Sequence, residues 1–226
     1  MPKKKHTAGK KTYSAIFDFF DAPIVTMDCG KKCAPLNGGE PVCCDTQNAV
    51  PVMNRSEYKL LKSRTDMWRK FKPYDAATQK IVDELSADCR AVTCNGARHC
   101  ERDNRSMSCR TFPFFPYFSK EGELLGLSYY WAFEDRCWVI SNMAAVEKKF
   151  IDQFIQAYRI LFAADQEELD VYIQYSASMR RVFSRWNRSI PVLDVNGGAF
   201  LVLPKGRGTR PVQPEKLPKH APYKNA

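Results

Sequence analysis

Cysteine is the residue type whose number and spacing in this sequence could support chemistry. Nine cysteines occur among the 226 residues, in two groups of four followed by a single one. The first group is Cys29, Cys33, Cys43 and Cys44, the second is Cys89, Cys94, Cys100 and Cys109, and the last is Cys137. Glycine and proline interrupt the first group too often for a long helix or strand. A loop with so few apolar residues needs metal coordination or disulfides to stabilise it.

No other motif in the sequence identifies a reaction. There is no P-loop, no dinucleotide-binding glycine pattern, no HExxH and no GxSxG. Of the three histidines, His6 and His220 lie near the ends, and His99 is interpreted as a surface residue beside Cys100. Whether the chain is an enzyme therefore stays open, and its catalytic residues are unknown.

The expected compartment decides between metal and disulfides. No run of about eighteen apolar residues occurs, so a transmembrane helix is not expected. The first residues, Met-Pro-Lys-Lys-Lys-His, are not followed by the apolar segment of a secretory signal. We therefore expect a cytoplasmic protein without membrane contact. Clustered cysteines in that compartment are more often metal ligands than disulfides.

The adjacent pair Cys43-Cys44 bears on how many metal centres to expect. Neighbouring side chains in extended backbone point to opposite sides, so two adjacent thiolates would rarely bind one ion. Two centres are then expected, or one ligand and one buried thiol. A single structural zinc needs only four ligands, so the high thiol count favours iron or an iron–sulfur cluster slightly over zinc.

The net charge of +10 lies at the two ends of the chain. Residues 1–11 contain five lysines and no acid, residues 204–226 contain six basic residues and one acid, and the remainder is balanced. A neutral body argues against a nucleic-acid-binding face on the fold. Residues 1–11 and 205–226 are predicted to be basic, disordered tails with at most weak contact to nucleic acid or a partner protein.

The apolar pattern predicts an α+β fold. The clearest signals are two amphipathic helices, over residues 142–163 and 166–186, expected to form an antiparallel hairpin. A β-hairpin is predicted from residues 190–195 and 199–203, around Asn196-Gly197-Gly198. The predicted domains are a cysteine-rich, metal-bound module with a small sheet over residues 12–140, closed by the helical hairpin and β-hairpin of residues 141–204.

Two cysteine motifs resemble those of a known family. Cys29 and Cys33, followed by the pair Cys43-Cys44, are similar to an opening cluster that ends in two cysteines. The segment Cys100-Glu-Arg-Asp-Asn-Arg-Ser-Met-Ser-Cys109-Arg-Thr-Phe-Pro is similar to a signature with the same gap between its cysteines. Together they resemble the bacterial YkgJ-type cysteine-cluster proteins, also called zinc- or iron-chelating CxxCxxCC domains. Ser106 replaces the usual proline, and the resemblance covers residues 28–140.

The resemblance implies a metal-binding protein without a settled reaction, sometimes described as an iron–sulfur oxidoreductase. It leaves Cys89 or Cys94 as the first ligand of the second group, with Cys94 preferred. The predicted ligands are Cys29, Cys33, Cys43, Cys44, Cys94, Cys100, Cys109 and Cys137, holding iron, an iron–sulfur cluster or zinc. The alternative is a zinc-stapled binding module that contacts nucleic acid or a partner protein through its basic tails.

Overall fold

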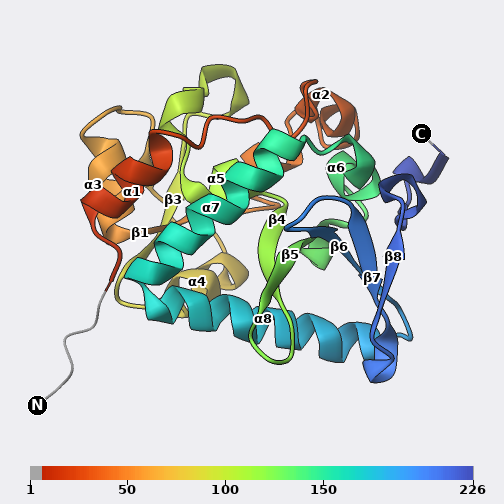
Figure 1. The fold of residues 1–226 in the computed structure, drawn as a ribbon. Helices are drawn as coiled ribbons and strands as arrows, with labels where there is room; N and C mark the ends of the chain where they lie inside the picture. The colour runs from red at the N-terminus through yellow and green to blue at the C-terminus, as the bar shows by residue number, and fades with distance from the viewer. Residues whose placement is uncertain (1–6, 226) are drawn as a thin grey trace, which may run out of the picture. The chain divides into compact units, whose positions relative to one another are not determined.

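The computed structural model describes residues 7–225, and the chain divides into two compact units (Figure 1). The first, the cysteine unit, comprises Ala8–Asp21 and Gly30–Phe112. The second, the sheet unit, comprises Ala22–Cys29 and the described residues from Pro113 onward. The boundary between them thus falls after Phe112 rather than at the expected position after residue 140. As a result, Cys29 and Cys137 belong to the sheet unit and the other seven cysteines to the cysteine unit.

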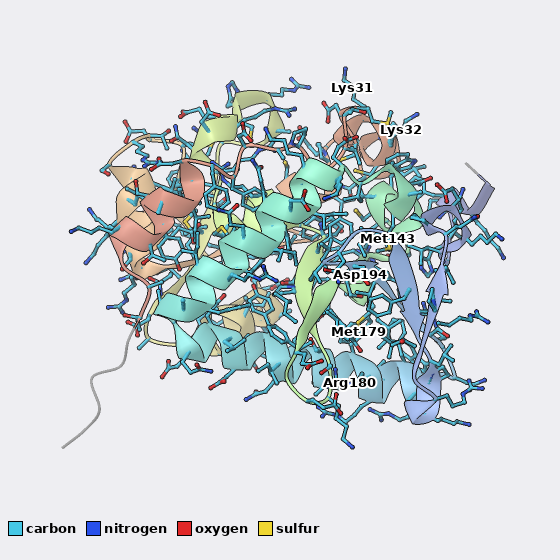
Figure 2. All side chains as sticks on the ribbon, in the orientation of Figure 1. Lys31, Lys32, Met143, Met179, Arg180 and Asp194 are labelled. Atoms are coloured by element: carbon cyan, nitrogen blue, oxygen red, sulfur yellow. The ribbon has the colours of Figure 1, made fainter. Side chains whose placement is uncertain are left out.

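The cysteine unit is built on a three-stranded antiparallel sheet in the order β1-β3-β2. Its strands are β1 (Val52–Asn54), β2 (Arg69–Lys70) and β3 (Cys89–Thr93). Helices α3 (Arg55–Lys62) and α4 (Ala76–Asp83) contact this sheet, and α1 (Lys10–Phe17) packs on α3. The short helices α2 (Gly30–Cys33) and α5 (Met107–Thr111) lie in the two cysteine-bearing stretches. Lys31 and Lys32 of α2 point into solvent (Figure 2).

Polar side chains fix where the helices of the cysteine unit begin. The Asn54 side chain accepts a hydrogen bond of 2.8 Å from the Ser56 N–H at the start of α3. Asp75 and Thr78 form a reciprocal capping box at the start of α4. Both caps depend on local sequence, because the residue that satisfies a free N–H at a helix start lies within a few positions of it.

The sheet unit contains a five-stranded antiparallel sheet in the order β4-β5-β6-β7-β8. Its strands are β4 (Phe114–Phe118), β5 (Leu124–Tyr129), β6 (Ile190–Asp194), β7 (Ala199–Val202) and β8 (Thr209–Val212). Helix α7 (Lys148–Ala164) contacts β5, and α8 (Gln166–Arg185) contacts β4 and β6. Met179 of α8 is fully buried in the core, and the neighbouring Arg180 donates a hydrogen bond to the Phe118 carbonyl (Figure 2).

The strongest sequence signals of this unit are confirmed in the structure. Helix α8 occupies nearly its predicted range, whereas α7 begins at Lys148, six residues later than predicted. The Asp165 side chain between them accepts a hydrogen bond from the Glu168 N–H at the start of α8. Strands β6 and β7 form the predicted hairpin. A short helix, α6 (Trp138–Ser141), precedes α7. The fold is α+β, as expected, and none of the helices within residues 7–225 is long and apolar enough to span a membrane.

The basic C-terminal segment is folded, contrary to its predicted disorder. Strand β8 pairs with β7 over four residues, and Leu217 and Tyr223 are buried at 6% and 5% exposure. Backbone pairing and two apolar anchors hold this segment despite its charge. At the other end, residues 1–6 of the predicted basic tail lie outside the described residues, whereas Lys10 and Lys11 begin α1.

Candidate thiolate metal centre

The seven cysteines of the cysteine unit come from different local structures. Cys33 is buried at the end of α2, where its thiol lies 3.5 Å from the Gly30 carbonyl. Cys43 and Cys44 lie in a short 3-10 turn, η2 (Val42–Cys44), that follows Pro41. Cys89 opens β3 opposite Asn54. Cys94 follows β3, Cys100 follows the 3-10 turn η3 (Ala97–His99), and Cys109 lies in α5.

The geometry of Cys43 and Cys44 differs from that assumed for the sequence. Their backbone is a 3-10 turn rather than an extended strand, and the two sulfur atoms lie 3.9 Å apart. Two thiolates that bind one tetrahedral zinc, each with a Zn–S distance of about 2.3 Å, have their sulfur atoms roughly 3.8 Å apart. The pair is therefore well placed to share one ion, and the argument that adjacent cysteines require two centres does not hold.

Electrostatic interactions connect this pair to the later cysteines. Burial raises the pKa of Cys94, and a hydrogen bond from the Gly96 N–H lowers it. Negative charge on Cys44 and Cys100 raises the pKa of Cys94 further. Burial also raises the pKa of Cys109 to about 12, and the Cys94 and Cys44 thiolates contribute to this shift. Five thiols thus lie close enough within the cysteine unit to influence one another's charge or that of Arg105. We call them the thiol cluster: Cys43, Cys44, Cys94, Cys100 and Cys109.

Arg105 supplies the positive charge in the thiol cluster. Its Nε donates a hydrogen bond of 3.2 Å to the Cys100 sulfur. Burial acts to lower the pKa of Arg105, but the hydrogen bond that Arg105 donates to Cys100 and the charges of Cys100, Cys109 and Cys43 raise this pKa above its usual range. Arg105 in turn lowers the pKa of Cys109, so this guanidinium favours the thiolate form of its neighbours.

Two further side chains position Cys109. The Ser106 hydroxyl caps α5 by accepting a hydrogen bond of 3.1 Å from the Cys109 N–H, and its interaction with the thiol lowers the pKa of Cys109. The carboxylate of Glu57, which is 2% exposed, accepts a 2.6 Å hydrogen bond from the Met107 N–H. Sequence reasoning gave no role to Arg105, Ser106 or Glu57. The local signal for Ser106 is its residue type, because serine is preferred at the N-cap and accepts a hydrogen bond from the N–H three residues later.

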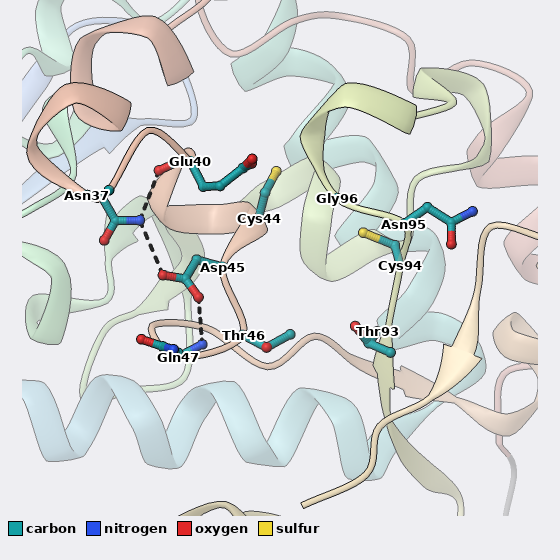
Figure 3. Close-up of a pocket in the computed structure, with 11 residues that line it drawn as sticks. Asn37, Glu40, Cys44, Asp45, Thr46, Gln47, Thr93, Cys94, Asn95 and Gly96 are labelled. Atoms are coloured by element: carbon teal, nitrogen blue, oxygen red, sulfur yellow. Dashed lines mark hydrogen bonds between the residues drawn. The ribbon is translucent and has the colours of Figure 1, made fainter. Parts of the chain in front are cut away.

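A polar pocket of about 670 Å³ borders the thiol cluster (Figure 3). Residues 37–47 and 93–96 line it, and Cys44 and Cys94 contribute one thiol from each segment. Asp45 shapes the first segment by accepting hydrogen bonds from Asn37, Asn48 and the Gln47 N–H. The thiol cluster therefore has an open, hydrophilic approach on the side of Cys44 and Cys94.

The structure groups five of the eight predicted ligands. Cys33 is buried in the same unit but at the end of α2, whereas Cys29 and Cys137 belong to the sheet unit. Cys94, the preferred first ligand of the second group, lies with the thiol cluster; its role as a ligand stays a prediction. Cys89 lies at the opposite end of β3 from Cys94.

The donor chemistry of the thiol cluster fits a thiolate-bound metal, although its side chains are not arranged around one point. Within residues 7–225, no group of three or more His, Cys, Asp or Glu side chains is already positioned to hold an ion. Sulfur donors are those that zinc, iron and iron–sulfur clusters prefer. Metal binding would displace the proton that Cys109, with a pKa of about 12, carries at neutral pH, and would draw the sulfurs together.

Comparisons of the chain with models of known protein families, with curated proteins and with solved structures found no match. The chemical interpretation of the thiol cluster therefore depends on its own residues.

Proposed function

We propose that the protein binds a metal, as zinc, iron or an iron–sulfur cluster, through thiolates of the thiol cluster. The observation that carries the proposal is the convergence of Cys43 and Cys44 with Cys94, Cys100 and Cys109 in one compact unit. The similarity of the same cysteine motifs to YkgJ-type proteins supports the same function.

The residues divide into ligands and supporting groups. Four thiolates around a divalent ion carry a net charge of about −2, and the guanidinium of Arg105 beside Cys100 offsets part of it. Ser106 and Glu57 fix the start of α5 and so the position of Cys109. These interactions tune the charge and orientation of the ligands, as outer groups do in many metal sites.

The chemistry that follows depends on the metal. Zinc would crosslink the loops of the cysteine unit, whereas iron or an iron–sulfur cluster would add one-electron redox chemistry. Since Cys43 and Cys44 are able to share one ion, a single centre with four of the five thiols is the simplest arrangement. Redox activity and metal handling are the two roles compatible with such a centre.

The test compares two cysteine variants of the same unit. Cys109→Ser removes a member of the thiol cluster, and Cys89→Ser removes a cysteine at the far end of β3. Protein purified without oxygen is assayed for iron, zinc and acid-labile sulfide per chain. We expect metal in the unaltered protein, at least a tenfold weaker affinity in Cys109→Ser, and little change in Cys89→Ser.

Two results would overturn the proposal. One is a protein that contains no metal and binds none when zinc or ferrous iron is added under reducing conditions. The other is equal metal loss in both variants, because the thiol cluster would then not be the site. A visible absorption band with sulfide would identify an iron–sulfur cluster, and a colourless protein with one zinc would identify a zinc centre.

A further inference from the structure

The pocket beside the thiol cluster is much larger than a bare metal ion needs. Its volume of about 670 Å³ lies within the range of small-molecule sites. A water molecule takes about 30 Å³ of liquid volume, so a divalent ion with six inner-shell waters occupies roughly 200 Å³. The pocket therefore has room for a metal ion that has not yet lost its water.

The lining of the pocket is polar and, where charged, acidic. Among the described residues that line it are three amides, two threonines and two carboxylates, but no lysine, arginine or histidine. The amides and hydroxyls suit a hydrated ligand, because they replace or bridge its water contacts. The carboxylates belong to Glu40 and Asp45. An anion would meet only negative charge there, and a cation would be attracted.

The two carboxylates have different roles. Asp45 is occupied by hydrogen bonds from Asn37, Asn48 and the Gln47 N–H within its own loop (Figure 3). Within residues 7–225, the Glu40 carboxylate has neither a hydrogen bond nor an ion pair, while its backbone carbonyl accepts from Asn37. The charge of Glu40 is therefore free to act on a ligand in the pocket.

We propose that this pocket is a cation-selective access site, in which a hydrated divalent metal ion binds before its transfer to the thiol cluster. Cys44 and Cys94 are the first thiols that the ion contacts, because they line the pocket. Glu40 attracts the ion, and the amides and hydroxyls hold its water shell. The inference rests on the proposed function, in that the thiol cluster is the destination of the ion.

The first experiment measures charge selectivity on the metal-free, reduced protein. Cys44 and Cys94 are modified with a cationic trimethylammonium methanethiosulfonate and with an anionic sulfonate analogue, and peptide mass spectrometry gives the rate at each cysteine. Rates are divided by those of a free small thiol. We expect a preference for the cation that falls about fivefold in Glu40→Gln. Glu84→Gln is the control outside the pocket: Glu84 is an exposed carboxylate that follows α4 and pairs with Lys80, and its replacement should leave the preference for the cation unchanged.

The second experiment measures transfer of the metal itself. Asn95→Trp adds a bulky side chain at the rim of the pocket, and Arg98→Trp adds one at a nearby exposed position outside it. Cobalt(II) uptake and its removal by a chelator are followed by stopped-flow absorption. We expect Asn95→Trp to slow both rates at least tenfold with unchanged final cobalt content, and Arg98→Trp to match the unaltered protein.

The outcomes separate this inference from the proposed function. Absence of cobalt binding in every variant would defeat the proposed function, and the labelling experiment would still decide whether the pocket selects cations. A normal cobalt content with an unchanged rate of cobalt uptake in both Asn95→Trp and Glu40→Gln would overturn the access site. The proposed thiolate centre would not be contradicted by that result. Equal labelling by the cationic and anionic reagents would overturn it as well.

Discussion

Single residues set the charge inside the thiol cluster. Cys109 has a pKa of about 12, mainly because of burial, whereas Arg105 and Ser106 act in the opposite direction. Without Arg105, the thiolates near Cys100 lose their nearest guanidinium, and more free energy is needed to displace their protons. The Nε of Arg105 donates a directional hydrogen bond to Cys100. A lysine at this position would keep the positive charge but not the planar set of N–H donors of a guanidinium.

We therefore expect Arg105→Gln to weaken metal binding at neutral pH by about tenfold, and Arg105→Lys to weaken it less. Since protons compete with the metal, all three affinities should rise with pH, and the difference between the proteins should persist because Cys109, with a pKa of about 12, keeps its proton in the metal-free protein below pH 9. Competition with a chromophoric zinc chelator between pH 6 and 9 measures this. Equal affinity in all three proteins across that range would contradict a role for Arg105 in the centre.

A second residue makes the stability of the sheet unit depend on pH. Burial raises the pKa of Glu168 to about 7, with the Asp165 charge adding to the shift and Tyr172 opposing it. The folded state therefore holds this proton more tightly than the unfolded chain, whose glutamate has its ordinary pKa. Stability from this residue is present at pH 4 and is lost as pH rises from about 4.5 to 7.

Glu168→Gln should accordingly remove this dependence. We expect the variant to be more stable than the unaltered protein at pH 8 by about 2 kcal/mol, with little difference near pH 4.5. Urea denaturation at the two pH values measures it. The account of Glu168 fails if the stability difference is the same at both.

Among the elements, short helix α5 links the fold to the thiol cluster. Its first turn is fixed by Ser106 and Glu57, and it carries Cys109. Helix α4 has a comparable cap at Asp75 but carries no cysteine. The two helices therefore allow the cost of losing a cap to be separated from its effect on the metal.

Ser106→Ala and Asp75→Ala should each cost about 1 kcal/mol of stability. Only Ser106→Ala should also reduce metal affinity, because Ser106 holds the Cys109 backbone and its thiol. Denaturant titration and metal titration on both variants make the comparison. Equal metal affinity would show that the position of α5 does not matter to the centre.

The elements that sequence predicted well are those with local signals. The caps at Asn54, Asp75 and Asp165, the range of α8, the end of α7 and the β6–β7 hairpin all follow from nearby residues. The 3-10 turn at Cys43-Cys44 was missed, because the backbone was taken as extended when Pro41 leads into a turn. The expectation of two metal centres therefore loses its argument from adjacent side chains and keeps only its argument from the number of thiols.

At the scale of the whole molecule, the errors came from long-range pairing. Strand β5 pairs with β6 although some sixty residues separate them, so residues from 113 onward belong with the C-terminal elements. Nothing in the local pattern near residue 112 indicates this. The C-terminal segment was predicted to be disordered because of its basic charge. It is folded, since β8 pairs with β7 and the side chains of Leu217 and Tyr223, which follow β8, are buried.

Removal of residues 207–226 should consequently destabilise the protein. Loss of two buried side chains costs about 3–5 kcal/mol, and β7 would lose its partner strand as well. The matched control replaces Lys205, Arg210 and Lys216, all exposed, with glutamine and should leave the melting temperature nearly unchanged. Calorimetry compares the two. A truncated protein with an unchanged melting temperature would show that this segment adds no stability.

The central claim is that the thiol cluster forms one sulfur-ligated metal centre. X-ray absorption at the edge of the metal found in anaerobically purified protein tests it most directly, because it reports the ligand atoms themselves. We predict a first shell of four sulfur atoms, at about 2.3 Å if the metal is zinc. A shell dominated by nitrogen or oxygen, or a metal-free protein whose cysteines titrate as disulfides, would contradict the account.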